Sequence, residues 1–319
     1  MTSSSQTPAS SDAHARYLGV RHFPCLDGIR CLCIVAVIWH HTRFDGTTFK
    51  IETRGYLGVD MFFVLSGFLI VTLLLRERDR KGQISLRNFY MRRTLRIFPL
   101  YYGTILAVSV GAFLFAPQGS TAEGLRHDLP YLLTYTINWV EAYSLLGIAW
   151  SLAAEEQFYL LWPPIERFLG RYAIVIVVGL IVLSQLIHFH LLDGVLHAVF
   201  GFGPDEPAML KQTTFTPILL GVLLAHLLHK RSTFVALRPV LGARFSSLVS
   251  LVGLLALLLF APFDVSGWPR LSIHLAMTAF LAACVLRSTT LIARALEWTP
   301  LRRIGDKIRW IEEQLARSE

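Results

Sequence analysis

The chain has 319 residues, of which 54% are hydrophobic and only 16% carry a charge. Soluble domains average about 25% charged residues, so this composition excludes most soluble, disordered and disulfide-rich proteins. The 30 Lys and Arg against 22 Asp and Glu give a net charge of +8, which we attribute to basic loops that orient membrane helices rather than to a nucleic-acid partner. The sequence predicts a polytopic membrane protein.

Residues 1–17 are rich in Ser, Thr and Ala and contain no apolar stretch, so we expect a disordered N-terminal tail rather than a signal peptide. Apolar segments then cover residues 28–44, 57–75, 95–116, 129–149, 150–168, 172–192, 213–229, 246–262 and 272–288. A membrane-spanning helix needs about 20 such residues, so we predict an all-α transmembrane bundle of about 8–10 membrane segments within residues 18–298.

The most basic stretch, residues 76–96, indicates the orientation, because Lys and Arg concentrate on the cytoplasmic side of a membrane. It predicts a cytoplasmic connection and, two spans earlier, a cytoplasmic N-terminus. The basic loop 229–244 is expected on the same side. This requires one segment between 129 and 168 to be re-entrant or interfacial, and we nominate Tyr131–Trp150 because polar residues and Gly and Ser breaks interrupt it.

Ionisable groups inside apolar segments cost about 2.5–3.5 kcal/mol each on insertion scales, and they indicate function by default. A helix would place Arg30 and His41 on one stripe, about 16 Å apart along its axis. In one interpretation they form a polar track, with the imidazole as general base and the guanidinium binding an anion. In the other, Arg30 merely reaches the interface and His41 or His40 ends the helix.

A second polar group begins at Trp150, where Ser151, Glu155 and Tyr159 share one helical face. Glu155 is suited to orient His41 or to transfer a proton, whereas Glu156 is expected to face another helix or the interface. Alternatively, both acids mark the start of an interfacial helix, where the dipole favours negative charge.

Arg93 and Arg96 lie three residues apart and would point the same way, which suits the binding of phosphate groups. The alternative is that they only determine topology. The four Cys match no zinc or disulfide spacing, so we interpret them as small apolar core residues and expect no metal site. Residues interpreted as interfacial are His188, His190, His226, His229 and His274, and those interpreted as helix-packing contacts are Gly58, Gly67 and Gly221.

Taken in order, these segments resemble the acyltransferase-3 family, the integral-membrane O-acyltransferases that modify bacterial cell-surface carbohydrates. The resemblance covers about residues 25–165. Its motifs are Leu26-Asp27-Gly28-x-Arg30 with ten residues before His41, Gly58-Val59-Asp60 through Ser66-Gly67-Phe68, Arg92-Arg93-x-x-Arg96 through Tyr101, Asn138-Trp139, and Trp150-Ser151-Leu152-x-x-Glu155 through Tyr159.

The resemblance implies transfer of an acyl group, usually acetyl, from cytoplasmic acyl-CoA to a carbohydrate hydroxyl on the far side of the bacterial inner membrane. It implies that His41 and Arg30 are the essential pair, that Glu155 is a further essential acid, and that Arg93 and Arg96 lie near the donor. Supporting or substrate-binding roles are expected for Asp27, Asp60, Ser66, Tyr101, Asn138, Trp150, Ser151, Glu156 and Tyr159. Acyl-CoA would be a co-substrate with no bound cofactor, and any periplasmic or glycan-assembly partner is expected to be a separate chain.

Two features depart from the family pattern. Residues 299–319 are charged and amphipathic, so we expect them on the cytoplasmic surface, where the family has a further span. Ile148 stands where the family often has a polar residue. Three alternatives remain open at this point: a transporter or channel for a small polar solute, a structural membrane scaffold, and acylation of a non-carbohydrate molecule such as a macrolide.

Overall fold

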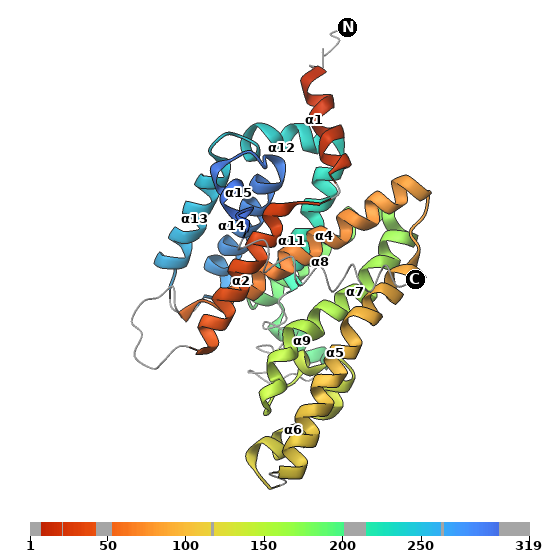
Figure 1. The fold of residues 1–319 in the computed structure, drawn as a ribbon, viewed down its shortest axis with the longest axis vertical. Coiled ribbons are helices and arrows are strands. Elements are labelled where there is room, and N and C mark those ends of the chain that lie inside the picture. Colours follow the sequence, from red (N-terminus) through yellow and green to blue (C-terminus); the bar gives the residue numbers. More distant parts are fainter. Residues whose placement is uncertain are drawn as a thin grey trace. The chain divides into compact units, whose positions relative to one another are not determined.

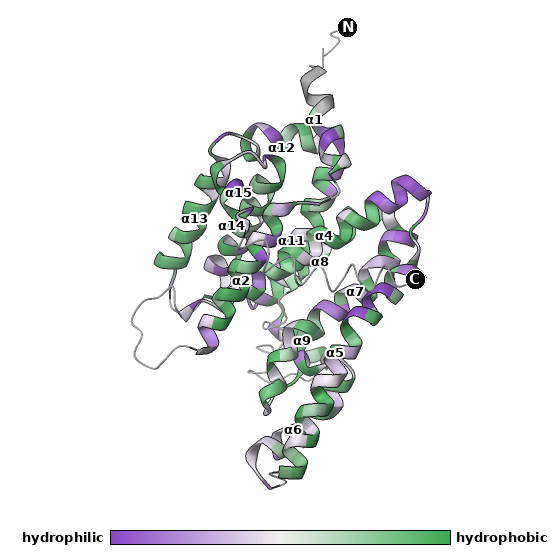
Figure 2. Ribbon diagram, in the orientation of Figure 1, coloured by the Kyte–Doolittle hydropathy of each residue, from purple (hydrophilic) through white to green (hydrophobic). Residues whose placement is uncertain are grey.

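A computed structural model describes residues 8–20, 22–42, 53–115, 118–200, 215–262 and 265–299. Every regular element in these ranges is an α-helix or a 3-10 turn, and none is a strand. Figure 1 shows the helices, and Figure 2 shows that hydrophobic residues cover most of their length. The all-α prediction is confirmed for this part of the chain.

Several helices are long and apolar enough to cross a membrane. They are α2 (Pro24–Thr42), α4 (Leu57–Lys81), α5 (Leu86–Phe115), the stretch Leu145–His188 and α14 (Gly267–Leu286). A sixth candidate consists of α11 (Phe215–His229) and α12 (Arg231–Leu241), which meet at a bend of 107°. The chain is therefore a multi-pass membrane protein.

The number of crossings, predicted as 8–10 segments, stays a prediction. The helix α13 (Ser246–Phe260) is apolar but has 15 residues, and α6 (Ser120–Leu133) has 14. Both are shorter than the roughly 20 residues that a straight span requires. The stretch Leu145–His188, in contrast, has 44 residues, which is more than one span needs.

The helices divide into two compact units, which we describe separately. The first unit, which comprises the described residues up to 80 and from 216 to 299, contains α1 (Pro8–Gly19), α2, α4, α11 to α14 and α15 (Leu291–Leu296). The second unit comprises the described residues from 81 to 200. Its elements are α5, α6, η1 (Ile137–Trp139), η2 (Leu145–Ala149), α7 (Trp150–Leu169), η3 (Gly170–Tyr172), α8 (Ala173–His188) and α9 (Asp193–Phe200).

In the first unit, glycine residues let α4 and α11 approach closely. A Cβ atom on Gly67 would lie 2.0 Å from the carbonyl oxygen of Ile218, and one on Gly221 would lie 2.2 Å from that of Val64. Gly58 packs against α2 in the same way. Small residues at helix contacts permit this proximity, so the packing role predicted for these three glycines is confirmed. The cysteines are also buried and free, as expected for small apolar core residues.

The helix α1 corrects the expectation of a disordered tail over residues 1–17, of which residues 1–7 lie outside the described part. Tyr17 and His14 are buried, and their rings pack on Phe234 of α12 with centroid distances of 5.5 and 4.9 Å. His14 Nε2 donates to the carbonyl of His229 at 2.9 Å, and burial raises the pKa of Tyr17 to about 12. Tertiary packing against a distant helix stabilises α1, and the local composition contains no signal of it.

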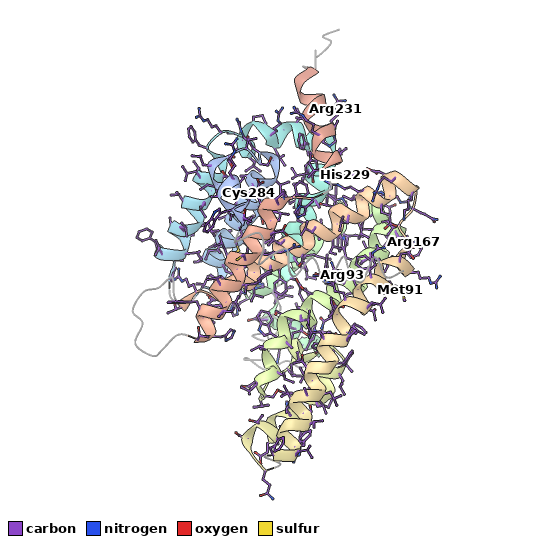
Figure 3. The ribbon with its side chains drawn as sticks, viewed as in Figure 1. Met91, Arg93, Arg167, His229, Arg231 and Cys284 are labelled. Atoms are coloured by element: carbon purple, nitrogen blue, oxygen red, sulfur yellow. The ribbon has the colours of Figure 1, made fainter. Side chains whose placement is uncertain are left out.

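In the second unit, α5 begins at Leu86, so much of the basic stretch 76–96 is helical rather than an extended connection. Ser85 Oγ accepts a hydrogen bond from the Asn88 N–H at 3.4 Å, in the manner of an N-cap. Arg167 of α7, labelled in Figure 3, donates to the carbonyl of Ile84 at 3.0 Å. These contacts hold the start of α5, and the arginines that follow therefore have helical spacing.

The stretch Tyr131–Trp150 is irregular, as predicted, because it contains the end of α6 and the short turns η1 and η2. Its buried residues belong to the core of the second unit, which consists of Tyr101, Ile105, Leu125, Leu132, Tyr135, Ile137 and Ala153. Re-entry of this stretch into a membrane stays a prediction. The expected amphipathic segment 299–319 lies almost wholly outside the described residues.

Candidate functional site

In the first unit, the buried carboxylate of Asp27 on α2 binds His22 and the predicted site residue Arg30. Asp27 is 1% exposed, and it accepts hydrogen bonds from His22 Nε2 at 2.7 Å and from Arg30 Nη1 at 3.1 Å. Arg30 is half-buried and lies one helical turn after its partner. A buried charge is tolerated when it is paired in this way, so Asp27 positions the guanidinium.

His41 lies in the last turn of α2, on the same continuous helix as Arg30. The shared stripe predicted from their spacing follows from the geometry of that helix. The imidazole of His41 is exposed, and it meets the ring of His40 edge-on at a centroid distance of 5.3 Å.

A second charged cluster in this unit contains Asp60, which was predicted from the sequence as a supporting residue, and two partners on α14 that were not predicted. Asp60 of α4 is 2% exposed and forms a hydrogen bond with His274 Nε2 at 3.0 Å, while Arg270 Nη2 lies 3.6 Å away. His274 is itself 2% exposed and is therefore packed inside the unit, while its expected position at a membrane interface stays a prediction. The signal that could have found it is the ionisable Asp60 in an apolar segment, because such a group requires a partner from another helix.

In the second unit, Arg93 of α5 lies over the ring of Tyr159 of α7, with its guanidinium carbon 4.2 Å from the ring centroid. Figure 3 labels Arg93. The charges of Arg93 and Arg96 both act on the carboxylate of Glu156, so these arginines share an environment, as their spacing predicts. A cation over an aromatic face is a favourable contact, and it restricts the position of this guanidinium.

The two glutamates of α7 differ in their surroundings. Glu155 is half-buried and shares its helical face with Ser151 and Tyr159, as predicted. Glu156 is also half-buried, but its Oε1 atom is inaccessible to solvent and has no hydrogen-bond partner among the described residues. We expected Glu156 to face another helix or the interface, and that position alone does not explain why the buried Oε1 atom has no hydrogen-bond partner in the described ranges.

Asn138 and Trp139 bind one side chain that the sequence analysis missed. Gln157 Oε1 accepts from Trp139 Nε1 at 3.0 Å, and Gln157 Nε2 donates to Asn138 Oδ1 at 2.8 Å and to the carbonyl of Tyr135 at 2.7 Å. The amide of Gln157 therefore links α7 to the irregular turn before it. The signal that could have found it is the buried Asn138, which is 9% exposed and needs a polar partner.

The remaining predicted residues are distributed over both units. Tyr101 is buried and donates from its hydroxyl to the carbonyl of Leu132 at 2.8 Å. Trp150 packs against the core of the second unit, Ser151 follows it in the first turn of α7, and Ser66 is half-buried in α4. His41 and Arg30 lie in the first unit, whereas Glu155, Arg93 and Arg96 lie in the second. A direct meeting of Glu155 with His41 therefore stays a prediction.

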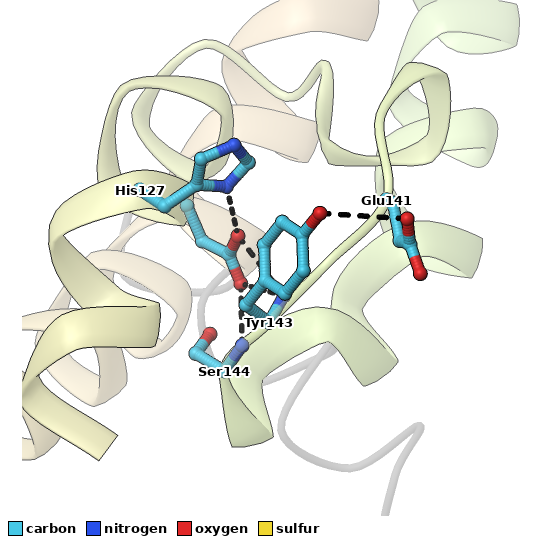
Figure 4. A network of polar contacts seen from close by, with 5 residues as sticks. His127, Glu141, Tyr143 and Ser144 are labelled. Carbon is cyan, nitrogen blue, oxygen red and sulfur yellow. Dashed lines mark hydrogen bonds and ion pairs between the residues drawn. The ribbon is translucent and has the colours of Figure 1, made fainter. Parts of the chain in front are cut away.

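Asp128 of α6 forms a further polar network that the sequence does not reveal, shown in Figure 4. Its carboxylate is fully buried and accepts from the backbone N–H of Tyr143 at 2.9 Å, that of Ser144 at 2.7 Å and His127 Nδ1 at 2.9 Å. Burial alone would raise the pKa of Asp128, but these hydrogen bonds outweigh it and lower the pKa below its usual range. The carboxylate thus anchors the loop that leads into α7.

Gly124 lies one turn before Asp128 on α6 and contacts the same loop. A Cβ atom at Gly124 would lie 2.6 Å from the carbonyl oxygen of Tyr143. Only glycine permits this approach, so Gly124 and Asp128 together determine where the loop before α7 lies. Across the described ranges, no group of three or more His, Cys, Asp or Glu side chains is arranged to hold a metal ion.

These features define a multi-pass membrane protein that holds paired charges and polar side chains among apolar helices. The chain belongs to the acyltransferase-3 family, whose acyltransferase domain matches residues 23–307. The motifs on which the resemblance rests lie within this match.

Curated relatives carry related names. The chain is 28% identical to the peptidoglycan O-acetyltransferase OatA of Listeria monocytogenes over 310 residues, which cover 90% of this chain and 48% of the relative. It is 30% identical to the O-acetyltransferase OatA of Staphylococcus aureus strain NCTC 8325 over 313 residues, which cover 90% of this chain and 49% of the relative. A protein of S. aureus strain COL, named provisionally as an O-acetyltransferase, is 32% identical over 231 residues, covering 66% of this chain and 36% of the relative.

The chain thus spans between about a third and a half of the length of the curated relatives it matches. No solved structure matches it significantly.

Proposed function

We propose that this chain is a membrane-embedded O-acyltransferase domain. It transfers an acyl group, most simply acetyl, from cytoplasmic acyl-CoA to a hydroxyl of a cell-surface carbohydrate or lipid-linked glycan. The observation that carries the proposal is the match of nearly the whole chain to relatives named as O-acetyltransferases, one of which is named for peptidoglycan. The membrane of action is the bacterial cytoplasmic membrane, with the N-terminus in the cytoplasm.

In this proposal the donor binds through its phosphate groups to Arg93 and Arg96. Arginine suits such a site because its planar guanidinium can donate two parallel hydrogen bonds to one phosphate. The contact of Arg93 with the Tyr159 ring supports the assignment, because it restricts the position of the guanidinium. Arg30, positioned by Asp27, is a further anion-binding group.

His41 is proposed as the general base. Its imidazole takes the proton from the acceptor hydroxyl while the hydroxyl oxygen attacks the thioester carbonyl carbon. The resulting tetrahedral intermediate breaks its carbon–sulfur bond, the ester forms, and the departing thiolate of CoA takes the proton from the imidazolium. The exposed position of His41 at the end of α2 supports this role, since a substrate can reach it. Glu155 is proposed as the acid that orients the imidazole or restores its proton balance.

Mass spectrometry of surface glycans tests the proposal. A deletion strain should lack O-acetyl groups, which mass spectrometry detects as a loss of about 42 Da per modified sugar. A plasmid with the wild-type chain should restore them, and one with His41→Ala should not. Unchanged acetylation of every surface glycan in the deletion strain would contradict the proposal. If the chain were instead a transporter, the deletion would change the uptake of a solute, and this uptake can be measured in the same strains.

A further inference from the structure

Tyr135 has a backbone conformation that residues other than glycine rarely adopt. Its φ angle is 54°, in the left-handed region. The residue stands just after the end of α6, where its N–H donates to the carbonyl of Leu132 at 3.2 Å and the next N–H, of Thr136, donates to that of Tyr131 at 2.8 Å. This pair of hydrogen bonds is the Schellman motif, and its left-handed position is usually occupied by glycine. A large aromatic side chain here is therefore held against a backbone preference.

Neighbouring groups of the second unit stabilise this strained tyrosine. Gln157 Nε2 donates to its carbonyl at 2.7 Å. Its ring stacks on Tyr101 at a centroid distance of 4.3 Å and on Phe98 at 5.6 Å, and the residue is 8% exposed. Strain that the surroundings maintain in this way clusters at functional sites, so an observed outlier of this kind justifies a search for a role.

The phenol oxygen of Tyr135 is buried and lacks a hydrogen-bond partner among the described residues, and so does Oε1 of Glu156. Gln157, the residue after Glu156, donates to the carbonyl of Tyr135 at 2.7 Å, and the charge of Glu156 acts on the Tyr135 phenol, so the two residues are neighbours in the fold. Most buried polar atoms in proteins have a partner, and each exception needs an explanation. Two such atoms on neighbouring residues, one a donor and the other an acceptor, suit a partner from outside the chain.

The chemistry of this pair identifies the class of ligand. A phosphate group, which Arg93 and Arg96 bind in the proposed function, offers no donor to the Glu156 oxygen, and an ammonium group offers no acceptor to the Tyr135 phenol. A neutral hydroxyl group offers one donor and accepts through its oxygen. It therefore satisfies both protein groups at once.

We infer that Tyr135 and Glu156 form a binding site for an alcohol hydroxyl of a carbohydrate, with the phenol donating to the ligand oxygen and the carboxyl oxygen accepting the ligand O–H. The inference rests on the proposed function, and it deepens that proposal by assigning the acceptor glycan to the second unit. Gln157 is a positioning residue, because it holds the peptide of Tyr135 and does not itself contact the ligand.

The test measures binding directly, without any need for turnover. The full chain in lipid nanodiscs is titrated with a soluble peptidoglycan disaccharide, as wild type and as the variants Tyr135→Phe and Glu156→Gln. The control is Tyr143→Phe, because the phenol of Tyr143 is exposed and donates to Glu141 at 3.4 Å. Phe keeps the stacked ring of Tyr135, so a similar melting temperature verifies that the variant folds.

Loss of one hydrogen bond should weaken the binding of the disaccharide about three- to tenfold in Tyr135→Phe. Glu156→Gln keeps an acceptor oxygen but loses the charge that strengthens its hydrogen bond, so it should weaken binding by a similar factor. Tyr143→Phe should bind as the wild type does. Equal affinities for all four proteins, or absence of binding by the wild type, would overturn the inference.

Acetyl transfer from acetyl-CoA to the same disaccharide separates this inference from the proposed function. If binding follows the expected pattern but the wild type transfers no acetyl group, the proposed function fails and the hydroxyl site stands. If transfer occurs and Tyr135→Phe leaves the KM for the disaccharide unchanged, the hydroxyl site is wrong and the proposed function stands. The expected result is a raised KM for the disaccharide with an unchanged KM for acetyl-CoA.

Discussion

The buried carboxyl groups of the two units differ in their hydrogen-bond partners. In the first unit, Asp27 binds His22 and Arg30, and Asp60 binds His274 with Arg270 nearby. In the second unit, Asp128 binds backbone N–H groups and His127, whereas the buried oxygen of Glu156 has no hydrogen-bond partner in the described part of the chain.

This difference separates structural polar groups from those available to a ligand. A buried charge whose partners all come from the chain stabilises one arrangement of helices and offers nothing to a substrate. A buried oxygen without a partner is costly, and a ligand that binds it recovers that cost. By this criterion, Asp27, Asp60 and Asp128 position other groups, whereas we propose that Glu156 and the exposed His41 are the groups that a substrate contacts.

The largest expected effect concerns His41. His41→Ala should lower acetyl transfer by a factor of about 10²–10⁴, because a general base contributes about that much. The measurement is transfer of labelled acetyl from acetyl-CoA in membranes that contain equal amounts of each protein. His190→Ala is the matched control, because that imidazole is exposed and pairs with Asp193. Full activity of His41→Ala would remove His41 from the mechanism.

The next effect concerns the pair of Asp60 and His274. His274→Leu should reduce the free energy of unfolding by about 3–5 kcal/mol, because it removes the imidazole that forms a hydrogen bond with the buried Asp60 carboxylate. Replacing both residues by Leu should recover much of that loss. Denaturation in detergent micelles measures both values, and a double variant no more stable than His274→Leu would show that the pair is not the source of the cost.

A smaller effect is expected at the contact between α4 and α11. Gly67→Ala should destabilise the protein by about 1–3 kcal/mol, because the added methyl group must displace the backbone at Ile218. The control is Gly253→Ala in α13, where a Cβ would meet no atom within 4 Å. This control should be neutral or slightly stabilising, since Ala favours helices by up to about 1 kcal/mol. Equal stabilities of the two variants would disprove the close contact.

The smallest effect concerns Asp128 and depends on pH. Its folded-state pKa is lowered, so its contribution to stability is complete above the ordinary pKa of Asp, about 3.9, and is lost as the pH falls through the lower folded value. Asp128→Asn should therefore melt below the wild type by a constant interval between pH 7 and pH 5, and the interval should narrow below about pH 4. An interval that widens on acidification would contradict the lowered pKa.

The sequence predicts the long helices because apolar runs of the required length need no knowledge of neighbours. The segments that contain α2, α4, α5 and α14 follow from hydropathy alone. The helix α1 does not, because Tyr17 and His14 are stabilised by Phe234, which is distant in sequence.

Candidate site residues could be predicted only where the residue type alone is unusual for its segment of the sequence. Arg30, His41, Asp60 and the glutamates of α7 are ionisable groups in apolar segments and therefore stand out. The roles of His274, Gln157 and Tyr135 depend on contacts made across the fold, namely a partner on α4, an amide bridge and a left-handed backbone. No local pattern in the sequence encodes such contacts.

The most direct test of the account uses sealed proteoliposomes that contain the purified chain and trapped soluble peptidoglycan fragments. Labelled acetyl-CoA is added outside, and the label on the trapped glycan is measured after the external donor has been removed. The account predicts label on the trapped glycan with the wild-type chain and background label with His41→Ala. Label that stays on acetyl-CoA, or an equal signal from both proteins, would contradict it.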